Sequence, residues 1–487
     1  MTKLYSLISQ KIIKKYQISN LLINGITCDS RKVKKGYIFA VFKGSNQNGI
    51  NYISQAIEKG ASAILIDEKD LKKTKSFVEV TIIPSAIPRK KYAQICNKFA
   101  NYNFDNIIGV TGTNGKTSVA WFVNKLTKLL GVDSASIGTL GVDHNSIKKN
   151  NSLTTPESEA LISSLNRLYC KNVKNIIIEA SSHGLEQYRL EGINFNIVVI
   201  TTLSRDHLDY HKTFNDYKRA KLKLFSEVSN KGVAIINQCI PQYKEFIEAA
   251  KSNNLKIITI GNSISSNWKY KVKNINFNEQ EVEIIFDKIK TTIFTKLIGE
   301  FQVNNLVTAI SILVEMGFTR DRIDKLISKI KAPPGRLELI KNIKGANIYI
   351  DYAHTPEALE NVLISIRPHV KNRLYLIFGC GGDRDKGKRP LMGAIANKYA
   401  DEIIITDDNP RYEDPTVIRN QIISFCPNSR EIADRTKAIN FVINNLVKGD
   451  ALLVAGKGHE NTQEINGKFI KFNDSTVINK IIKSLVN

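Results

Sequence analysis

The chain has 487 residues, of which 42% are hydrophobic and 24% are charged, and its formal net charge at pH 7 is +24. Because a domain usually holds about 100 to 200 residues, this length predicts roughly three domains. No apolar run is as long as a membrane span and no cleavable apolar leader is visible, so we expect a cytoplasmic protein without membrane insertion.

Cysteine and lysine usage narrows the possible partners. The six cysteines are scattered without a Cys-x-x-Cys pair, which argues against a zinc site or a redox dithiol. Lysines are spread along the chain rather than gathered in one block, which favours a compositional bias over nucleic-acid binding. We therefore expect small-molecule substrates, no nucleic acid and a monomer, and an anionic substrate would gain from the positive field.

Residues 1–101 form the first predicted domain, which mixes short strands with short helices. Strands are predicted over 21–27, 36–41 and 63–67, and helices over 51–60 and 90–102. Between the first two strands lies the polar turn Asp29-Ser30-Arg31. Taken alone, this segment is more simply explained as a surface turn with a capping serine.

A strand over 106–110 leads into a glycine-rich loop, and a helix with apolar residues at helical spacing follows. Loop N–H groups and the helix N-terminus can surround phosphate oxygens, Lys116 can reach the terminal phosphates, and the Thr117 hydroxyl can hold Mg²⁺. The strict phosphate-loop pattern has glycine where this chain has Val110, so a glycine-rich turn without a ligand is the alternative. The residues predicted to bind the triphosphate are Gly112, Thr113, Asn114, Gly115, Lys116, Thr117 and Ser118.

Strands over 134–137, 175–179, 197–201, 232–236 and 256–260 alternate with helices, which predicts an α/β fold with a parallel sheet covered on both faces. Ligands on such sheets bind at the carboxyl ends of the strands. Glu179 and His207 follow two of these strands, and both could reach a magnesium ion. A single histidine at a strand end is more often a satisfied polar residue, but five of the seven histidines lie in such polar or glycine-rich segments.

The rest of the central domain, residues 102–331, contains three further features. Residues 216–225 start a helix with Lys221 among four basic residues, for which a solvated basic face is the default interpretation. Residues 275–297 are predicted to form a hairpin or small sheet. A helix is predicted from 299 to 314, with Asn304 and Asn305 near its start.

Residues 332–487 form the third predicted domain, which begins beside the linker-like segment Pro333-Pro334-Gly335-Arg336. Strands over 348–351, 374–378, 402–406 and 451–455 each end in a polar or glycine-rich loop. This pattern predicts a Rossmann-like domain with one ligand-binding rim.

Five motifs, in chain order, resemble those of the Mur ligase family, the ATP-dependent amide-forming enzymes that build the peptidoglycan stem peptide. They are Thr-Gly-Thr-Asn-Gly-Lys-Thr, Glu-Ala-Ser-Ser-His-Gly-Leu, Asp-His-Leu-Asp-Tyr-His, Asp-Tyr-Ala-His-Thr-Pro and Gly-Lys-Gly-His-Glu. Asp29-Ser30-Arg31 with Phe39-Ala40 resembles the tripeptide-forming members. Asp408-Asn409-Pro410-Arg411 resembles the version that selects meso-diaminopimelate over lysine.

The resemblance implies a UDP-sugar-binding N-terminal domain, a central ATPase-like domain and a C-terminal amino-acid-binding domain. It implies ATP and Mg²⁺ as cofactors, phosphorylation of the D-glutamate carboxylate of a UDP-muramoyl-dipeptide, and attack of an amine on the acyl phosphate. It assigns catalysis to Lys116, Glu179, His207 and Lys221, the last as a carbamate. The implied metal set is Thr117, Glu179, His207 and the Lys221 carbamate.

The resemblance also implies the remaining contacts. Asn304 and Asn305 would meet adenine, with Arg336 and Asp351 on the C-terminal side of the nucleotide, while Ser30 and the segment 45–48 would meet the uridine diphosphate. The dipeptide would contact Thr154, Thr155, Ser181, Gln187 and Arg189. Diaminopimelate would contact Arg384, Asp408, Asn409, Pro410, Arg411, Gly456 and Glu460, with Glu460 pairing an ammonium group.

Arg411 gives this substrate choice a physical basis. Diaminopimelate differs from lysine by a distal carboxylate, which a planar guanidinium binds bidentately. We expect lysine to leave a buried guanidinium unpaired and to be rejected for that reason. The alternatives are a lysine-adding, alanyl-alanine-adding or folylpolyglutamate ligase, and, from another class, a basic phosphate-loop protein that uses ATP to act on nucleic acid.

Overall fold

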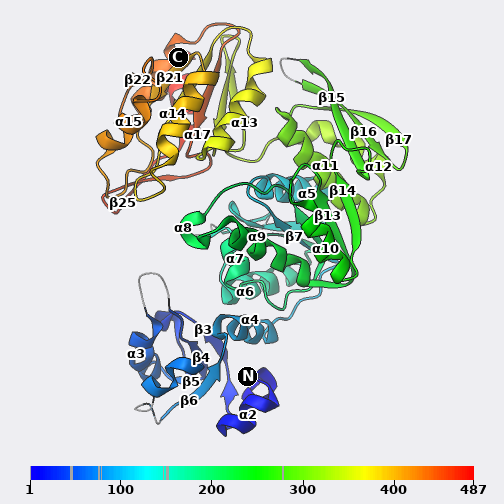
Figure 1. Cartoon of the computed structure of the whole chain (residues 1–487), viewed down its shortest axis with the longest axis vertical. Helices are drawn as coiled ribbons and strands as arrows, with labels where there is room; N and C mark the ends of the chain where they lie inside the picture. Colours follow the sequence, from blue (N-terminus) through cyan, green and yellow to red (C-terminus); the bar gives the residue numbers. More distant parts are fainter. Residues whose placement is uncertain are drawn as a thin grey trace. The chain divides into compact units, whose positions relative to one another are not determined.

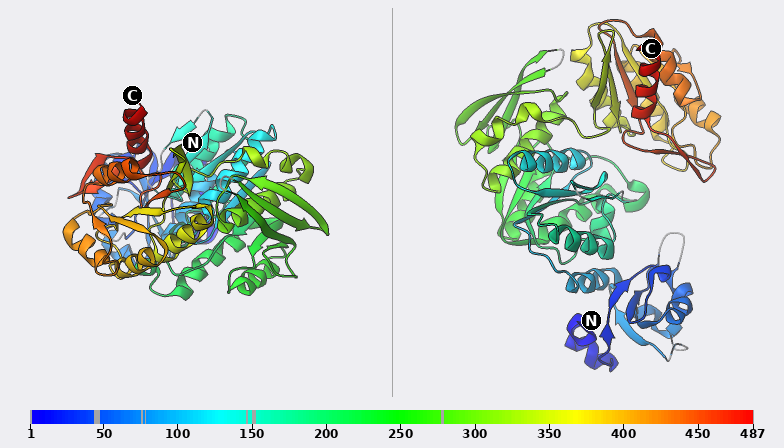
Figure 2. Two further views of the ribbon diagram at one scale, coloured as in Figure 1. Left: turned by 90° about the horizontal axis from the view of Figure 1, so that it is seen from above. Right: turned by 180° about the vertical axis from the view of Figure 1, so that it is seen from behind.

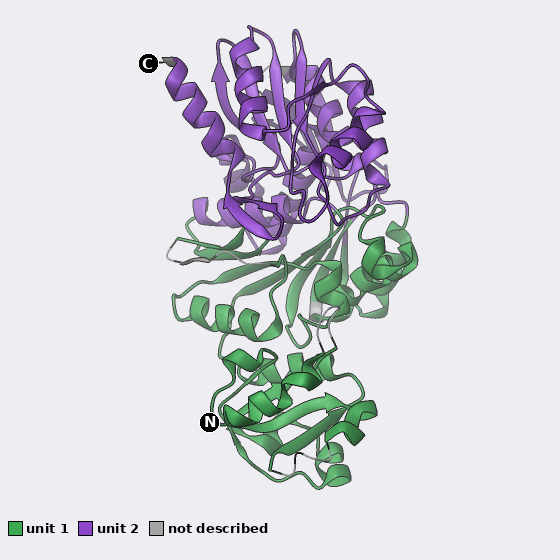
Figure 3. Ribbon diagram, turned by 90° about the vertical axis from the view of Figure 1, so that its left-hand side faces the viewer, with its two compact units in different colours: residues 1–113, 131–236, 242–257 green, residues 114–130, 237–241, 258–487 purple. Residues whose placement is uncertain are grey.

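The computed structural model describes residues 2–43, 48–74, 77, 79–145, 147–149, 153–276 and 279–486 (Figure 1). Contacts divide the chain into two compact units (Figure 3): unit 1 holds residues 1–113, 131–236 and 242–257, and unit 2 holds 114–130, 237–241 and 258–487. The predicted domain boundaries near 101 and 331 stay predictions. Of the expected uridine-contacting segment, residues 45–47 lie outside the described residues.

The N-terminal part of unit 1 is built on a four-stranded parallel sheet in the order β3-β4-β5-β6. Its strands are β3 (Gly25–Thr27), β4 (Tyr37–Ala40), β5 (Ala61–Asp67) and β6 (Thr81–Ser85), with α3 (Ile53–Glu58) and α4 (Pro88–Lys98) nearby. The predicted strand over 21–27 is interrupted, because β2 (Leu22–Ile23) pairs instead with β1 (Thr2–Lys3). Short helices α1 (Leu4–Leu7) and α2 (Gln10–Tyr16) precede it.

The second sheet region of unit 1 has the order β10-β9-β8-β11-β7-β12-β13. Parallel strands are β7 (Asn106–Thr111), β8 (Ser134–Gly138), β11 (Asn175–Glu179), β12 (Phe195–Ile200) and β13 (Val228–Asn237), while β9 (Gly141–His144) and β10 (Ile147–Lys149) are antiparallel. Its helices are α6 (Ser158–Tyr169), α7 (Ser182–Glu186), α8 (Leu208–His211), α9 (Phe214–Leu222) and α10 (Tyr243–Ser252). In register, Glu179 lies opposite Val110 and Ile200 opposite Thr111, so the loops that follow these three strands leave the same edge.

Unit 2 begins with α5 (Lys116–Leu129), which packs against the almost wholly buried α11 (Glu300–Glu315). Strands β15 (Trp268–Asn276), β16 (Glu279–Phe286) and β17 (Ile289–Thr295) pair antiparallel and confirm the predicted hairpin region, which starts earlier than expected. Trp268 explains the earlier start, because its buried ring stacks on Phe286 with a centroid distance of 4.0 Å.

The C-terminal part of unit 2 is a six-stranded sheet in the order β18-β19-β23-β20-β21-β22. The edge strand β18 (Glu338–Ile343) is antiparallel, and β19 (Ala346–Asp351), β23 (Ala451–Ala455), β20 (Leu374–Phe378), β21 (Glu402–Ile405) and β22 (Arg430–Glu431) are parallel. One buried cluster joins the sheet to α13 (Pro356–Ile366), α14 (Lys388–Tyr399) and α15 (Pro415–Ile423), and a second joins it to α16 (Arg435–Asn445) and α17 (Asp474–Val486).

Helices therefore cover both faces of this sheet, as Figure 2 shows, and the predicted Rossmann-like arrangement is present. The loops after β19, β20, β21 and β23 leave its carboxyl edge. A hairpin of β24 (Thr462–Ile465) and β25 (Lys468–Lys471) follows β23. Across the described ranges, no helix is both long and apolar enough to span a membrane.

Candidate active site

The glycine loop after β7 contains two glycines with positive φ. Gly112 has φ 149° and Gly115, the N-cap of α5, has φ 86°, both in the region that favours glycine. Thr113 fixes the first half of the loop, because its N–H donates to Thr202 O at 2.8 Å and its hydroxyl lies 2.9 Å from the Tyr217 hydroxyl. The first turn of α5 itself holds no acidic residue.

Glu179 ends β11 with its carboxylate buried. One carboxylate oxygen accepts a hydrogen bond from Thr139 N and the other from Thr139 Oγ1, each at 3.0 Å. Gly138 makes this possible, because a β-carbon there would collide with the Glu179 carboxylate. The sequence interpretation missed Thr139, whose only signal was its place after a predicted strand.

His207 lies after β12 in a cluster of rings. Its backbone is left-handed, with φ 53°, and its ring centroid is 4.8 Å from that of His183. Burial, together with His207 and His211, lowers the pKa of His183 to about 4. Within the described part of the chain, no three His, Cys, Asp or Glu side chains form a cluster that could hold a metal ion. The metal set of Thr117, Glu179, His207 and Lys221 stays a prediction.

Lys221 on α9 is 1% exposed, so the default of a solvated basic face is wrong for this residue. Its ammonium donates to Gly112 O at 2.8 Å and lies 4.4 Å from the centre of the Tyr217 ring. The default holds for Arg219 on the same helix, whose side chain is 73% exposed. Helical spacing turns Lys221 toward the glycine loop, where the resemblance had placed it.

The residues predicted to contact the dipeptide form one hydrogen-bonded group in unit 1. Thr155 Oγ1 donates to Glu179 O at 2.7 Å and lies 3.0 Å from Ser181 Oγ. Arg189 donates to Thr155 O and to Gln187 Oε1, both at 2.7 Å. Thr154 joins the group through its hydroxyl, 3.2 Å from that of Thr139. Ser30 is held separately, by a 2.6 Å hydrogen bond to Gln55.

The predicted nucleotide residues of unit 2 are also buried. Asn304 donates to the Tyr270 hydroxyl at 3.0 Å and accepts from Asn237 at 3.2 Å, and Asn305 follows it on α11. The Arg336 guanidinium lies 4.8 Å from the centre of the Tyr352 ring. These assignments to adenine and to the nucleotide stay predictions.

Asp351 ends β19 and accepts hydrogen bonds from Leu337 N at 2.6 Å and Ala353 N at 2.7 Å. Burial raises its pKa to about 6, although Arg336 and the two backbone hydrogen bonds act in the opposite direction. Through these two hydrogen bonds, its carboxylate connects the segment just before β18 to the loop that follows β19.

Two of the predicted diaminopimelate residues, Asn409 and Glu460, meet at a lysine that the sequence interpretation missed. Lys457 is fully buried, and its ammonium donates to Asn409 Oδ1 at 3.0 Å, Glu460 Oε2 at 2.9 Å and Thr462 O at 2.8 Å. Asn409 also donates to Glu460 Oε2 at 3.0 Å. Gly456 leaves room for Asp408, whose Oδ2 would be 2.6 Å from an added β-carbon. Lys457 lies inside the quoted Gly-Lys-Gly-His-Glu motif, which was the available signal.

Arg411 departs from one expectation. Its Nη1 donates to Gly382 O at 2.8 Å, and its Nε lies 3.0 Å from Glu464 Oε2. The expectation that lysine would leave this guanidinium unpaired is wrong, because Glu464 already balances its charge. Pro410 precedes it in the same loop, and Arg384 is exposed in the loop after β20.

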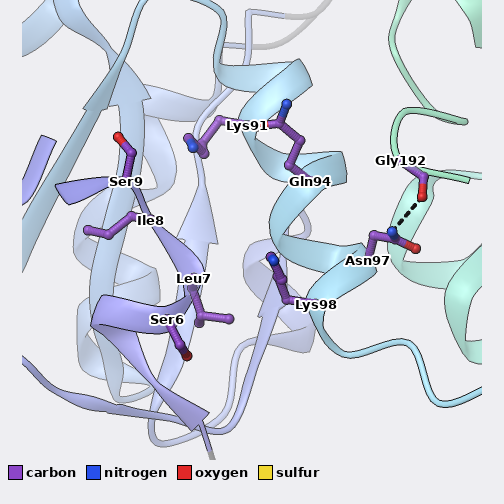
Figure 4. Close-up of a pocket in the computed structure, with 9 residues that line it drawn as sticks. All are labelled: Ser6, Leu7, Ile8, Ser9, Lys91, Gln94, Asn97, Lys98 and Gly192. Carbon is purple, nitrogen blue, oxygen red and sulfur yellow. Dashed lines mark hydrogen bonds between the residues drawn. The ribbon is translucent and has the colours of Figure 1, made fainter. Parts of the chain in front are cut away.

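A separate cavity of about 400 Å³ lies in unit 1 between the N-terminal segment and α4 (Figure 4). None of the predicted site residues lines it. Its lining residues include Lys91, Lys98 and Asn97, which donates to Gly192 O at 2.5 Å.

Known proteins resemble this chain over most of its length. Three family descriptions match: "Mur ligase family, catalytic domain" over residues 22–102, "Mur ligase middle domain" over 110–313 and "Mur ligase, glutamate ligase domain" over 335–458. A UDP-N-acetylmuramoyl-L-alanyl-D-glutamate–2,6-diaminopimelate ligase of Rickettsia typhi is 40% identical over 485 residues, covering 97% of this chain and 96% of its own length. The chain belongs to the Mur ligase family.

Solved structures extend the comparison. A UDP-N-acetylmuramoyl-L-alanyl-D-glutamate–2,6-diaminopimelate ligase matches with a TM-score of 0.69 and 31% identity, covering 96% of each chain. A MurF ligase from Thermotoga maritima in complex with ADP shares the fold, with a TM-score of 0.62 and 16% identity, over 96% of this chain and 99% of its own. The predicted Mur ligase family, three-domain α/β fold class and ATP-dependent amide-forming ligase activity are confirmed.

Proposed function

We propose that this Mur ligase joins meso-2,6-diaminopimelate to the D-glutamate of UDP-N-acetylmuramoyl-L-alanyl-D-glutamate in peptidoglycan precursor synthesis. ATP would phosphorylate the D-glutamate side-chain carboxylate, the amine would attack the acyl phosphate, and phosphate would leave. The observation that carries the substrate choice is the Asp408-to-Arg411 loop, whose Asn409 contacts both Glu460 and the buried Lys457. The curated relatives named for this substrate support it.

The glycine loop would hold the triphosphate. Lys116 is the first residue of α5, and Thr117 and Ser118 follow it at the helix N-terminus, where backbone N–H groups and the helix dipole favour phosphate oxygens. Arg336 and Asn304 would contact the nucleotide from other parts of unit 2. Correct placement of the reacting groups supplies much of the rate enhancement in such a transfer.

The residues near the loop suit Mg²⁺, which prefers oxygen ligands. Glu179 presents a buried carboxylate that Thr139 holds at the end of β11. We propose that Glu179 and His207 hold Mg²⁺, which would neutralise charge on the transferred phosphoryl group. Lys221 would contribute as a carbamate. A carbamate nitrogen keeps one hydrogen, so its bond to Gly112 O could persist.

Arg411 would bind the distal carboxylate of diaminopimelate through the N–H groups that face away from Gly382 and Glu464. Discrimination against lysine would then come from the missing carboxylate contact, rather than from an unpaired charge. The free oxygen of Glu460 would receive an ammonium group, since its Oε2 is already bound to Lys457. We propose small-molecule substrates, a monomer and a cytoplasmic location for the enzyme.

The test supplies the UDP-muramoyl-dipeptide, ATP and Mg²⁺ with diaminopimelate or lysine, and identifies the product by mass spectrometry. We expect the diaminopimelate tripeptide and ADP. Arg411→Ala should lose diaminopimelate ligation by about 10²-fold or more in kcat/KM. If this variant keeps the preference over lysine, or if the wild-type protein prefers lysine, the substrate assignment is wrong.

A further inference from the structure

Glu464 on β24 holds the backbone of Arg411. The Arg411 N–H donates to Glu464 O at 3.1 Å, and Asn466 N donates to Arg411 O at 2.7 Å. Arg411 has φ 52°, a left-handed conformation that is unfavourable for a residue with a β-carbon. The hairpin strand therefore stabilises an unusual backbone conformation at the residue predicted to choose the substrate.

Glu464 also holds the side chain of Arg411. Its Oε2 lies 3.0 Å from Arg411 Nε, and the two side chains are 22% and 21% exposed. At this burial the attraction is screened less than in a surface ion pair. With Gly382 O bound to Nη1 at 2.8 Å, the guanidinium is fixed from two different segments.

The same residue connects to the neighbouring part of the pocket, because Glu464 N donates to Asn409 Oδ1 at 3.0 Å. Asn409 and Arg411 thus both depend on one residue of β24. None of the sequence motifs includes Glu464, and no role was predicted for it.

We propose that Glu464 is a positioning residue that orients the Arg411 guanidinium for the distal carboxylate of the amino-acid substrate. The proposal rests on the proposed function. Glu464 does not itself contact the substrate carboxylate, since two negative groups would repel each other. It holds Arg411 at Nε so that the Nη2 side is presented in one orientation, which lowers the entropy lost on binding.

Glu464 has two effects on diaminopimelate binding that act in opposite directions: its contact with Nε orients Arg411, and its negative charge competes with the substrate carboxylate. Two substitutions separate these effects. Glu464→Ala removes both the anchor and the negative charge, whereas Glu464→Gln removes the charge and keeps an oxygen near Nε. If positioning dominates, Glu464→Ala should raise the KM for diaminopimelate about tenfold, and Glu464→Gln by less than about threefold. The kcat and the KM for ATP should stay within about twofold of wild type.

The control is Glu402→Ala, which removes another Glu–Arg ion pair of unit 2, between Glu402 at the start of β21 and Arg373 at 3.0 Å. It should leave every kinetic constant unchanged, and thermal unfolding of all variants checks that each is folded. In an Arg411→Ala background, Glu464→Ala should have no further effect on the KM for diaminopimelate, because the residue acts through Arg411.

An unchanged or lower KM for diaminopimelate in folded Glu464→Ala would overturn the inference, and a lower value would identify the carboxylate as a competitor of the substrate. An equal further loss in the Arg411→Ala background would also overturn it. Failure of the proposed function looks different, because the wild-type enzyme would then form no diaminopimelate product.

Discussion

Arg189 in unit 1 and Arg411 in unit 2 are both predicted to contact a substrate, but their surroundings differ. Arg189 is 8% exposed, donates to Thr155 and Gln187, and lies 3.0 Å from Glu157. Arg411 is more exposed, and its side chain makes one hydrogen bond and one ion pair. The first lies close to a sheet edge, and the second lies on a loop held by a hairpin.

The comparison shows which contacts hold the predicted substrate-binding residues in place in each region. In unit 1 the parallel strands themselves bring Glu179 and the residues after β12 to one edge, and short polar side chains complete the group. In the C-terminal region the loops need a buried side chain that joins them, and Lys457 has that place. Removing the Lys457 ammonium should therefore lower the free energy of unfolding more than any single substitution at a strand end.

Lys457→Met is the largest expected effect. It removes a buried ammonium that donates to Asn409, Glu460 and Thr462 and leaves the Glu460 carboxylate without its cation, which should lower the free energy of unfolding by about 3–5 kcal/mol. Urea unfolding measures the loss, and Lys448→Met at an exposed position is the control. A loss within about 1 kcal/mol would show that the loops are held by other contacts.

Glu179→Gln should act on the reaction more than on the fold. The amide oxygen can still accept from Thr139, so stability should change little, but the negative charge proposed to hold Mg²⁺ is lost. We expect kcat to fall by about 10²- to 10³-fold, measured as ADP release in a Mg²⁺ titration. Glu186→Gln, which removes a charge paired with Lys223, should change kcat little. Full activity of Glu179→Gln would remove Glu179 from the metal set.

Gly138→Ala tests the strand-end site without touching its charges. The added β-carbon would collide with the Glu179 carboxylate, which should cost about 1–3 kcal/mol of stability and reduce ligation. Gly131→Ala is the control, because that position has nothing within 4 Å and only its φ of 87° is strained. Equal loss of activity in both variants would mean that the position of Glu179 does not matter.

Particular residues explain how far the sequence could predict this structure. Glu179 was found because it ends a strand, and a parallel sheet brings strand ends to one edge whatever the side chains are. Asp351 also ends a strand, but its assignment came from the family resemblance. Lys221 was misjudged from its basic neighbours, because the direction in which a helix faces depends on tertiary packing.

Thr139, Lys457 and Glu464 were missed for a different reason. Each acts on another side chain from a distant part of the sequence, and neither spacing nor periodicity encodes which loops meet. Glu464 pairs with a residue more than fifty positions earlier, on a loop whose left-handed Arg411 gives no sequence signal. The residue type of Arg411 predicted that it could bind a carboxylate. It could not predict that Glu464 already balances the charge of the guanidinium.

In the wild-type protein the smallest expected effect is on the pH dependence of stability, because it is the difference between two opposed contributions. They come from two buried groups, Asp351 at the end of β19 and His459 in the loop after β23. Burial raises the pKa of Asp351 to about 6 from 3.8, so this group contributes stability below pH 3.8 that is lost as pH rises through about 6. Burial and Arg336 lower the pKa of His459 to about 4 from 6.5. His459 contributes stability above pH 6.5 that is lost as pH falls through about 4.

Each shift corresponds to about 3 kcal/mol, so the two contributions should nearly cancel in the wild-type protein between pH 4 and 6.5. Single substitutions should separate them. Relative to wild type, Asp351→Asn should lose about 3 kcal/mol of unfolding free energy between pH 7 and 4, and His459→Phe should gain about as much. Urea unfolding across this range measures both. If the unfolding free energy of His459→Phe instead rose with pH over this range, the assignment would be contradicted, because the Asp351 carboxylate would then be ionised in the folded protein.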